Sequence, residues 1–177
     1  MNAGLTRVYV PTTAGGLVAL AAGTLPAPQA YAVTERLRSL LAIGSEDFAG
    51  VEDELAEAAV VAASDACLVL LTDEPDAPRL RIVVAADVVA HPGGPLDVHP
   101  AQVQCPAGDI PLAAVASVLA DDPDDIAVRA AVIAAIAAQR HGSSADAENA
   151  LDALDDHALA WFDSGEIADL VARIADD

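Results

Sequence analysis

Two groups of side chains in this sequence have residue types that can do chemistry. Members of the first group are hydroxyl or carboxylate residues that each follow a short apolar segment: Thr12, Thr34, Asp87, Asp121, Asp122 and Asp163. Hard cations take oxygen ligands, so this set suits Mg²⁺ or a phosphate ester held through it. If the preceding segments are parallel strands, all six residues lie at the sheet edge where open α/β folds bind ligands. The pattern therefore predicts a ligand site that a divalent cation could occupy.

The same residues also have a structural explanation. Thr12, Thr34, Asp122 and Asp163 each stand before a predicted helix, where Ser, Thr, Asp and Asn are the preferred capping residues. The sequence contains no DxD-type phosphatase signature, Gly-rich phosphate loop or nucleophile elbow. These absences favour a protein that is not an enzyme and needs no cofactor.

The second group is His91, Asp97 and His99, which share the segment HPGGPLDVH. Imidazole and carboxylate groups bind transition metals, so this segment is a candidate metal site. Its Pro and Gly content fixes no ligand spacing, and exposed loop histidines explain the pattern as well. Cys105 follows six residues later, but a buried strand position explains it better than a metal-ligand role.

The elements that would position these residues follow from the apolar pattern. Strands are predicted over about 6–10, 29–33, 80–85, 103–105 and 158–162. Helices are predicted over about 13–22, 36–43, 48–71, 124–139, 144–154 and 166–174. Periodicity does not separate helix from strand over 67–71 and 112–119, although helix is favoured for 67–71. The β-branched run 80–85 is predicted to be a central strand, buried on both faces.

This order of elements predicts one globular domain over residues 1–177. Its class is α/β (or α+β), with a mixed or parallel sheet of about five strands flanked by helices. Residues 88–110 are rich in Pro and Gly and predict a long loop within the domain. Long irregular loops are more often functional than merely connecting.

The charge of the chain restricts its partners. The sequence has no lysine, 28 Asp and Glu residues, and a net charge of −20. Such a surface repels phosphate backbones and anionic lipid, which argues against direct nucleic-acid or membrane binding. It attracts a protein with a basic surface, or it simply keeps an alanine-rich chain soluble. Alanine-rich helices also offer flat surfaces on which a homodimer could form.

The sequence predicts a cytoplasmic protein. Cys67 and Cys105 form no disulfide framework and stand in apolar segments, as buried reduced cysteines do. Residues 30–32 have the A-x-A form of a signal-peptidase site, but Arg7 is the only basic residue before the apolar run 14–23. No apolar stretch is predicted to reach the length that spans a bilayer.

Several segments resemble those of a small family of uncharacterised acidic proteins from high-GC actinobacteria. They are RVYVPT at 7–12, AYAVT at 30–34, RIVVAAD at 81–87, PLAAVASV at 111–118, LAWF at 159–162 and EI at 166–167. Together they extend over most of the chain. The resemblance implies a bacterial cytoplasmic protein and transfers no catalytic residue.

Three hypotheses about function follow. The first is a non-catalytic interaction or regulatory module, which the acidity, the small size and the missing catalytic motif favour. The second is a metal-assisted enzyme of the Mg²⁺ type, which requires Asp87, Asp121 and Asp163 to converge. The third is a DNA-mimic inhibitor, which requires a stripe of acids at the spacing of duplex phosphates.

Overall fold

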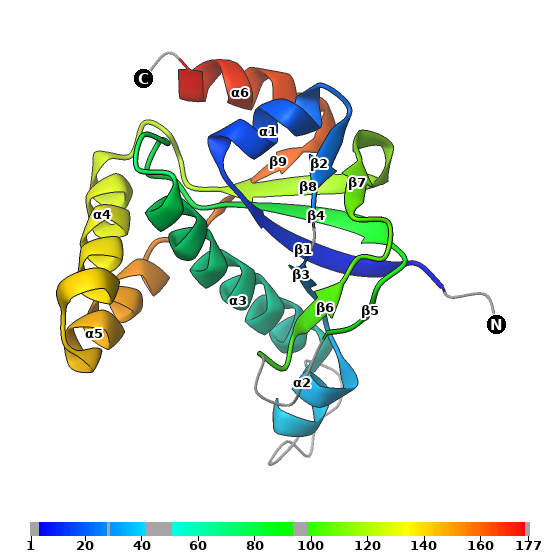
Figure 1. Cartoon of the computed structure of the whole chain (residues 1–177), viewed down its shortest axis with the longest axis horizontal. Helices are drawn as coiled ribbons and strands as arrows, with labels where there is room; N and C mark the ends of the chain where they lie inside the picture. The colour runs from blue at the N-terminus through cyan, green and yellow to red at the C-terminus, as the bar shows by residue number, and fades with distance from the viewer. Residues whose placement is uncertain (1–3, 28, 42–50, 94–98, 176–177) are drawn as a thin grey trace.

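A seven-stranded sheet in the order β5-β6-β3-β1-β4-β8-β9 forms the centre of the protein (Figure 1). The structure is a computed structural model that describes residues 4–27, 29–41, 51–93 and 99–175. The strands of this sheet are β1 Thr6–Thr12, β3 Ala30–Tyr31, β4 Ile82–Val88, β5 His91–Pro92, β6 Gln102–Gln104, β8 Val115–Ala120 and β9 Ala160–Asp163. A two-stranded ribbon, β2 Thr24–Pro26 with β7 Asp109–Pro111, packs beside it.

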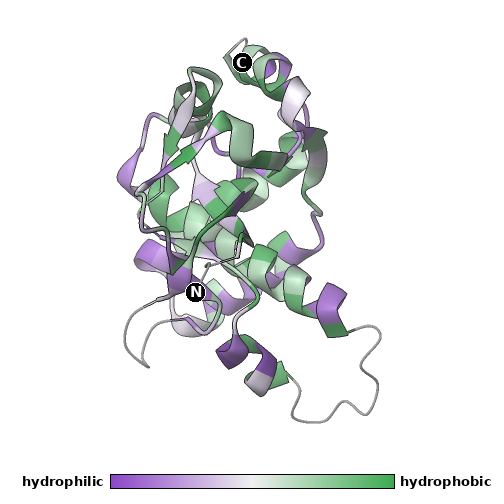
Figure 2. Cartoon of the chain, turned by 90° about the vertical axis from the view of Figure 1, so that its right-hand side faces the viewer, coloured by the Kyte–Doolittle hydropathy of each residue, from purple (hydrophilic) through white to green (hydrophobic). Residues whose placement is uncertain are grey.

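Helices cover both faces of the sheet. They are α1 Ala14–Ala21, α2 Glu35–Leu41, α3 Val51–Asp73, α4 Ile126–His141, α5 Ser144–Asp155 and α6 Ile167–Ala175, with short 3₁₀ helices at Leu112–Ala114 and Ser164–Glu166. Helices α1 and α6 lie on one face, and α3 crosses the other, with the α4–α5 hairpin beside it (Figure 1). The covering helices carry polar residues next to apolar ones, as amphipathic helices on a core do (Figure 2). The predicted combination of sheet and flanking helices is confirmed.

The prediction of a parallel or mixed sheet of about five strands is wrong. Each neighbouring pair in the seven-stranded sheet is antiparallel. The run 80–85 did yield a central strand, since β4 lies between β1 and β8. Its apolar residues are buried because helices cover both faces of the sheet. That condition does not depend on strand direction, and the run therefore gave no information about direction.

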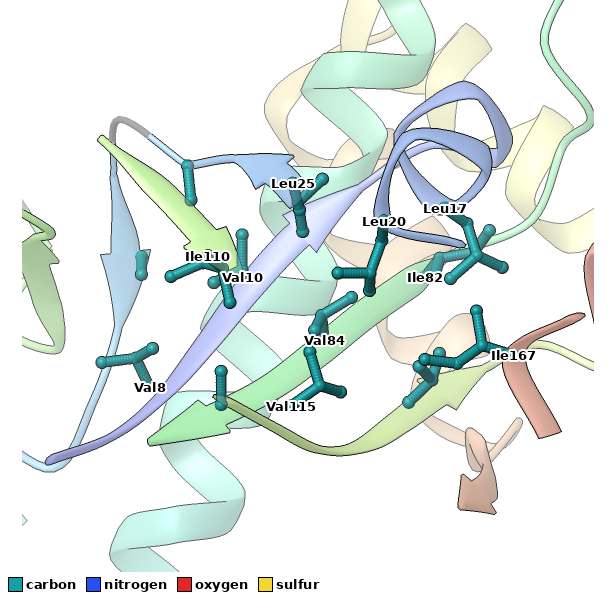
Figure 3. Packing of buried hydrophobic residues seen from close by; sticks show 14 of the residues in the cluster. Val8, Val10, Leu17, Leu20, Leu25, Ile82, Val84, Ile110, Val115 and Ile167 are labelled. Carbon is teal, nitrogen blue, oxygen red and sulfur yellow. The ribbon is translucent and has the colours of Figure 1, made fainter. Parts of the chain in front are cut away.

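Alternating residues of β1 and β4 divide the core into two layers. Val8, Val10, Ile82 and Val84 face α1 and α6 in the largest cluster of buried side chains (Figure 3). Tyr9 and Val83 belong to the cluster on the opposite face, which α2 and α3 cover. A third cluster, Leu68, Leu71, Val132, Ala135, Ile136 and Leu154, joins α3 to the α4–α5 hairpin.

Helix α3 is the longest element, and it confirms that residues 67–71 are helical. By length and composition it is also the one helix among the described residues that could cross a membrane, contrary to the expectation from the sequence. This indication is weak, because the core helix of a soluble protein meets the same test. Here its buried residues pack on the sheet through Leu55 and Ala63 and on α4–α5 through Leu68.

Segments predicted to be irregular contain further short strands. Residues 88–110 include β5, β6 and the start of β7, rather than a single short strand at 103–105. Residues 112–119 form a 3₁₀ turn and most of β8. Strand β2 was not predicted, because three residues between Gly23 and Pro28 carry no detectable periodicity.

Candidate functional site

The antiparallel sheet separates the residues that were predicted to form one ligand site. Strands β1 and β8 end at the same edge, where Thr12 pairs with Ile82 and Ile82 with Ala120. Thr12, Asp121 and Asp122 therefore lie at that edge. Strands β3, β4 and β9 run the other way, which places Thr34, Asp87 and Asp163 toward the opposite edge. The geometry that the metal-assisted hypothesis requires, with Asp87, Asp121 and Asp163 together, is absent.

Asp121 belongs to a buried polar network. Its carboxylate accepts hydrogen bonds from the Arg81 backbone N at 2.7 Å and from Arg81 Nη2 at 2.7 Å. Arg81 Nη2 also donates to the carbonyl of His157 at 2.7 Å, and Nη1 lies 3.4 Å from both Ser64 Oγ and the Leu154 carbonyl. Both ionic side chains are buried. The network thus joins β8 and the residue before β4 to α3 and to the end of α5.

The carboxylates at the surface are also engaged within the protein. Asp87 forms a two-point ion pair with Arg7, at 2.7 and 3.0 Å, and this hydrogen bonding lowers the pKa of the Asp87 carboxyl. Asp122 accepts a hydrogen bond from Arg173 Nη2 at 2.8 Å, as Asp124 does. Neither caps α4, whose N-cap is Asp125.

Two of the predicted capping residues are confirmed as caps. Thr34 Oγ1 accepts a hydrogen bond from the Leu37 backbone N at 3.1 Å and donates to the Pro100 carbonyl at 2.5 Å. Asp163 accepts from the Gly165 backbone N at 2.9 Å, while its own backbone N donates to Glu166 at 2.7 Å. These bonds form a capping box.

The structure describes two of the three predicted ligands of the histidine segment, and these two line different cavities. His91 lies in β5 beside a cavity of about 230 Å³, whereas His99 lines different cavities on α3. Asp97 lies outside the described residues. His99 Nδ1 accepts a hydrogen bond from the Ala101 backbone N at 3.2 Å, and burial together with the charge of Arg36 lowers the His99 pKa. Among residues 4–27, 29–41, 51–93 and 99–175, no three His, Cys, Asp or Glu side chains are grouped as metal ligands.

A magnesium titration should therefore leave the unfolding temperature unchanged relative to sodium at matched ionic strength. A cation stabilises a protein only when it binds the folded state preferentially, and the carboxylates in question already accept bonds from the protein itself. The measurement is thermal unfolding in Mg²⁺, Mn²⁺ and Zn²⁺. A divalent-specific rise that Asp87→Ala or Asp163→Ala abolishes would restore the metal site.

A groove along α3 is the principal concave feature, and the sequence analysis did not predict it. One part is a cavity of about 580 Å³ between α3, β1 and β2. The other part is a cavity of about 410 Å³ between α3 and Leu41 of α2. Ala62, Asp65 and His99 line both, so the two cavities adjoin along α3. We refer to them together as the α3 groove.

The floor of the α3 groove is apolar. Alanine and branched side chains of α3 line it: Ala58, Val61, Ala62, Ala66, Val69 and Leu70. Val61 is 40% exposed and Val69 58% exposed, so their side chains present apolar surface to solvent. Tyr31 contributes its ring, which meets His99 edge-on with 5.9 Å between centroids.

Four carboxylates lie along this apolar floor: Glu54, Glu57, Asp65 and Glu74. In the described part of the chain, none of them has an ion-pair partner, and no arginine lines the groove. Asp65 is exposed on one side, yet its pKa is raised. The main cause is desolvation by the groove walls, and the second is the charge of Asp155. Ionisation of Asp65 therefore costs more than ionisation of a fully solvated carboxyl group.

The wall opposite α3 is formed where β1 extends beyond β3. Strand β1 pairs with β3 at Tyr9 and Tyr31, and Val10 to Thr12 continue along the cavity. Gly16 of α1 lets this helix approach the end of β1, because a Cβ built at Gly16 would lie 2.0 Å from Thr12 Oγ1. Thr12 thus has a defined place in the groove wall, but no role in a shared cation site.

The sequence does carry one signal for this groove. Val61, Asp65 and Val69 recur every fourth residue and so share a helix face, and Asp65 interrupts the apolar run from Ala58 to Leu71. A carboxylate within a buried-looking helix marks a face that is not fully covered. The contribution of β1 and His99 could not be predicted, because it depends on contacts distant in sequence.

Comparison with known proteins identifies the family and no activity. No curated protein and no solved structure matches the chain. The family of unknown function DUF6912 matches residues 6–171, which is most of the sequence. The chain therefore belongs to the DUF6912 family.

Proposed function

We propose that this protein is a non-catalytic interaction module that binds a partner in the α3 groove. One observation carries the proposal: the groove holds four carboxylates without ion-pair partners among the described residues. Some acids elsewhere pair with arginine, as in Arg7–Asp87 and Arg173–Asp122, whereas others such as Asp152 on α5 form no ion pair among the described residues. The groove thus combines uncompensated charge with a concave apolar surface.

The physical character of the groove supports binding. A cavity of about 580 Å³ with an apolar floor and a few polar groups has the size and composition of ligand sites in proteins. Charged groups around a low-dielectric cleft also focus the electrostatic field and accelerate the arrival of an oppositely charged partner. A partner with a basic surface would meet both features.

The alternative functions gain less support. A metal-assisted enzyme requires carboxylates that are held together, whereas Asp87 and Asp121 lie toward opposite edges of the sheet. A DNA mimic requires a regular stripe of acids, whereas apolar residues such as Val61 and Val69 separate those of the groove. The predicted cytoplasmic location and homodimer stay predictions.

Selection from a random peptide library should show whether the α3 groove is the binding surface. We expect Ala66→Trp to abolish enrichment of binding peptides, because the indole would fill the groove beside Asp65. The matched control is Ala153→Trp, which adds the same side chain at an exposed position on α5. The measurement is sequencing of peptides retained by the wild type and by each variant.

Mass spectrometry of the recovered peptides tests the non-catalytic part of the proposal. Unchanged masses are expected, because the groove is proposed to bind without turnover. If Ala66→Trp retains the same peptides as the wild type, the groove is not the site. If the peptides return cleaved or modified, the protein is an enzyme.

A further inference from the structure

Resting on the proposed function, we infer that the α3 groove binds a short extended segment of a partner protein that carries both basic and apolar residues on the side facing α3. Its Arg or Lys side chains would face Glu54, Asp65 and Glu74, and its apolar side chains would lie on Val61 and Val69. This inference specifies the chemistry of the partner, which the proposed function leaves open.

The length of the groove favours a polypeptide over a small molecule. Glu54 and Glu74 line its two ends and are twenty residues apart on α3 and its C-terminal extension. At a helical rise of 1.5 Å per residue, the groove extends for about 30 Å. Asp65 lies about 16 Å from Glu54 along the helix axis and about 14 Å from Glu74. An extended segment of about nine residues spans this distance at roughly 3.3 Å per residue.

The charge of the groove favours basic side chains. Its four carboxylates stand over apolar surface and form no ion pair with a described residue, although the charge of Arg81 acts on Asp65. Charges in such partly desolvated surroundings interact more strongly than charges in bulk water. A guanidinium beside Asp65 would restore the stability that its charged form loses through desolvation by the groove walls.

The apolar floor argues against a simple polycation. A ligand that carried charge alone would leave Val61, Ala66 and Val69 in contact with water. A segment with apolar side chains between its basic residues covers that surface and gains the hydrophobic contribution as well. In an extended chain, side chains two residues apart point to the same side, so the basic and apolar residues of the partner must share the side that faces α3.

Fluorescence anisotropy with a labelled nine-residue peptide tests the inference; Arg and Val alternate at its odd-numbered positions, which share one side of an extended chain, and Ser occupies the even-numbered positions. At about 0.15 M salt, where the screening length is about 8 Å, we expect saturable binding by the wild type. Asp65→Asn should weaken it about tenfold or more, because a charge-assisted hydrogen bond is lost. The matched control is Asp152→Asn, which removes the same charge from an exposed position on α5 and should leave the Kd unchanged within about twofold.

Folding of the Asp65→Asn variant is checked by thermal unfolding at pH 7. A carboxyl whose pKa is raised on folding lowers stability as pH increases from its ordinary pKa through the raised value. The neutral amide removes this loss, so the variant should unfold at the wild-type temperature or above it. A weakened Kd then reports on the groove and not on unfolding.

The competing outcomes separate the inference from the proposed function. Equal binding of a peptide with citrulline in place of Arg would overturn the requirement for basic side chains, while groove binding would survive. Equal weakening by Asp152→Asn, or displacement by spermidine at equal charge concentration, would overturn the inference in favour of general attraction of cations. The proposed function itself would be overturned if no peptide bound and if Ala66→Trp left the enrichment of library peptides unchanged.

Discussion

Replacement of Asp121 by alanine should lower the free energy of unfolding by about 3–5 kcal/mol, the usual result of breaking a buried ion pair from one side. The guanidinium of Arg81 is buried and depends on Asp121 for its only carboxylate partner among the described residues. Its remaining bonds, to Ser64, Leu154 and His157, involve neutral oxygens and cannot balance a full charge. Loss of the carboxylate also removes the acceptor of the Arg81 backbone N.

The matched control for Asp121→Ala is Asp87→Ala. Asp87 forms an equally short ion pair, 2.7 Å from Arg7, but both side chains are more than 40% exposed. Exposed pairs contribute about 0–1 kcal/mol, so this variant should change stability little. Urea denaturation measures both, with the midpoint reporting stability when the slope is unchanged. If both variants lost the same free energy of unfolding, burial of the Arg81 network would add nothing to the stability of the folded state.

The second large effect is expected at Leu68. Leu68→Ala should destabilise the protein by about 2–5 kcal/mol, because it removes buried methyl groups and leaves a cavity. Leu68 is fully buried where α3 meets α4 and α5, and its neighbours there include Ala135 and Val132. Such short side chains reach poorly into a new cavity, which places the expected loss in the upper part of that range.

Val69→Ala is the matched control, because Val69 is the next residue of α3 and is 58% exposed. Its substitution should change stability by no more than about 0.5 kcal/mol. In a chain of 177 residues, each kcal/mol shifts the unfolding temperature by about 2–4 °C, so calorimetry separates the two variants clearly. If Val69→Ala lowered the stability as much as Leu68→Ala does, α3 would have a different orientation from the one described.

Much of the secondary structure could be predicted from local pattern. Helix α6 follows from apolar periodicity, and the cap at Asp163 from residue type and position. The capping box that Ser143 forms with Asp146 likewise agrees with the predicted start of α5. These features depend on neighbours within four residues, which is why the sequence alone was sufficient.

The direction of the strands could not be predicted in the same way. A strand such as β4 is apolar throughout because helices cover it on both sides, whichever way its neighbours run. The predicted cation site depended on that direction. Asp87 lies near the end of β4 and Asp121 directly follows β8, but those strands are antiparallel, so their ends are apart. Their actual partners, Arg7 and Arg81, belong to contacts 80 and 40 residues distant in sequence.

The two outermost strands of the sheet limit how copies of this protein can associate. On one side β5 has only two residues, one of them Pro92, which offers no backbone donor. On the other side β9 has four residues and ends at Asp163, whose charge opposes an identical approaching strand. Short edges that carry proline or charge resist the templated pairing that leads to fibres. The described edges of this sheet therefore disfavour association of copies of the chain through strand pairing.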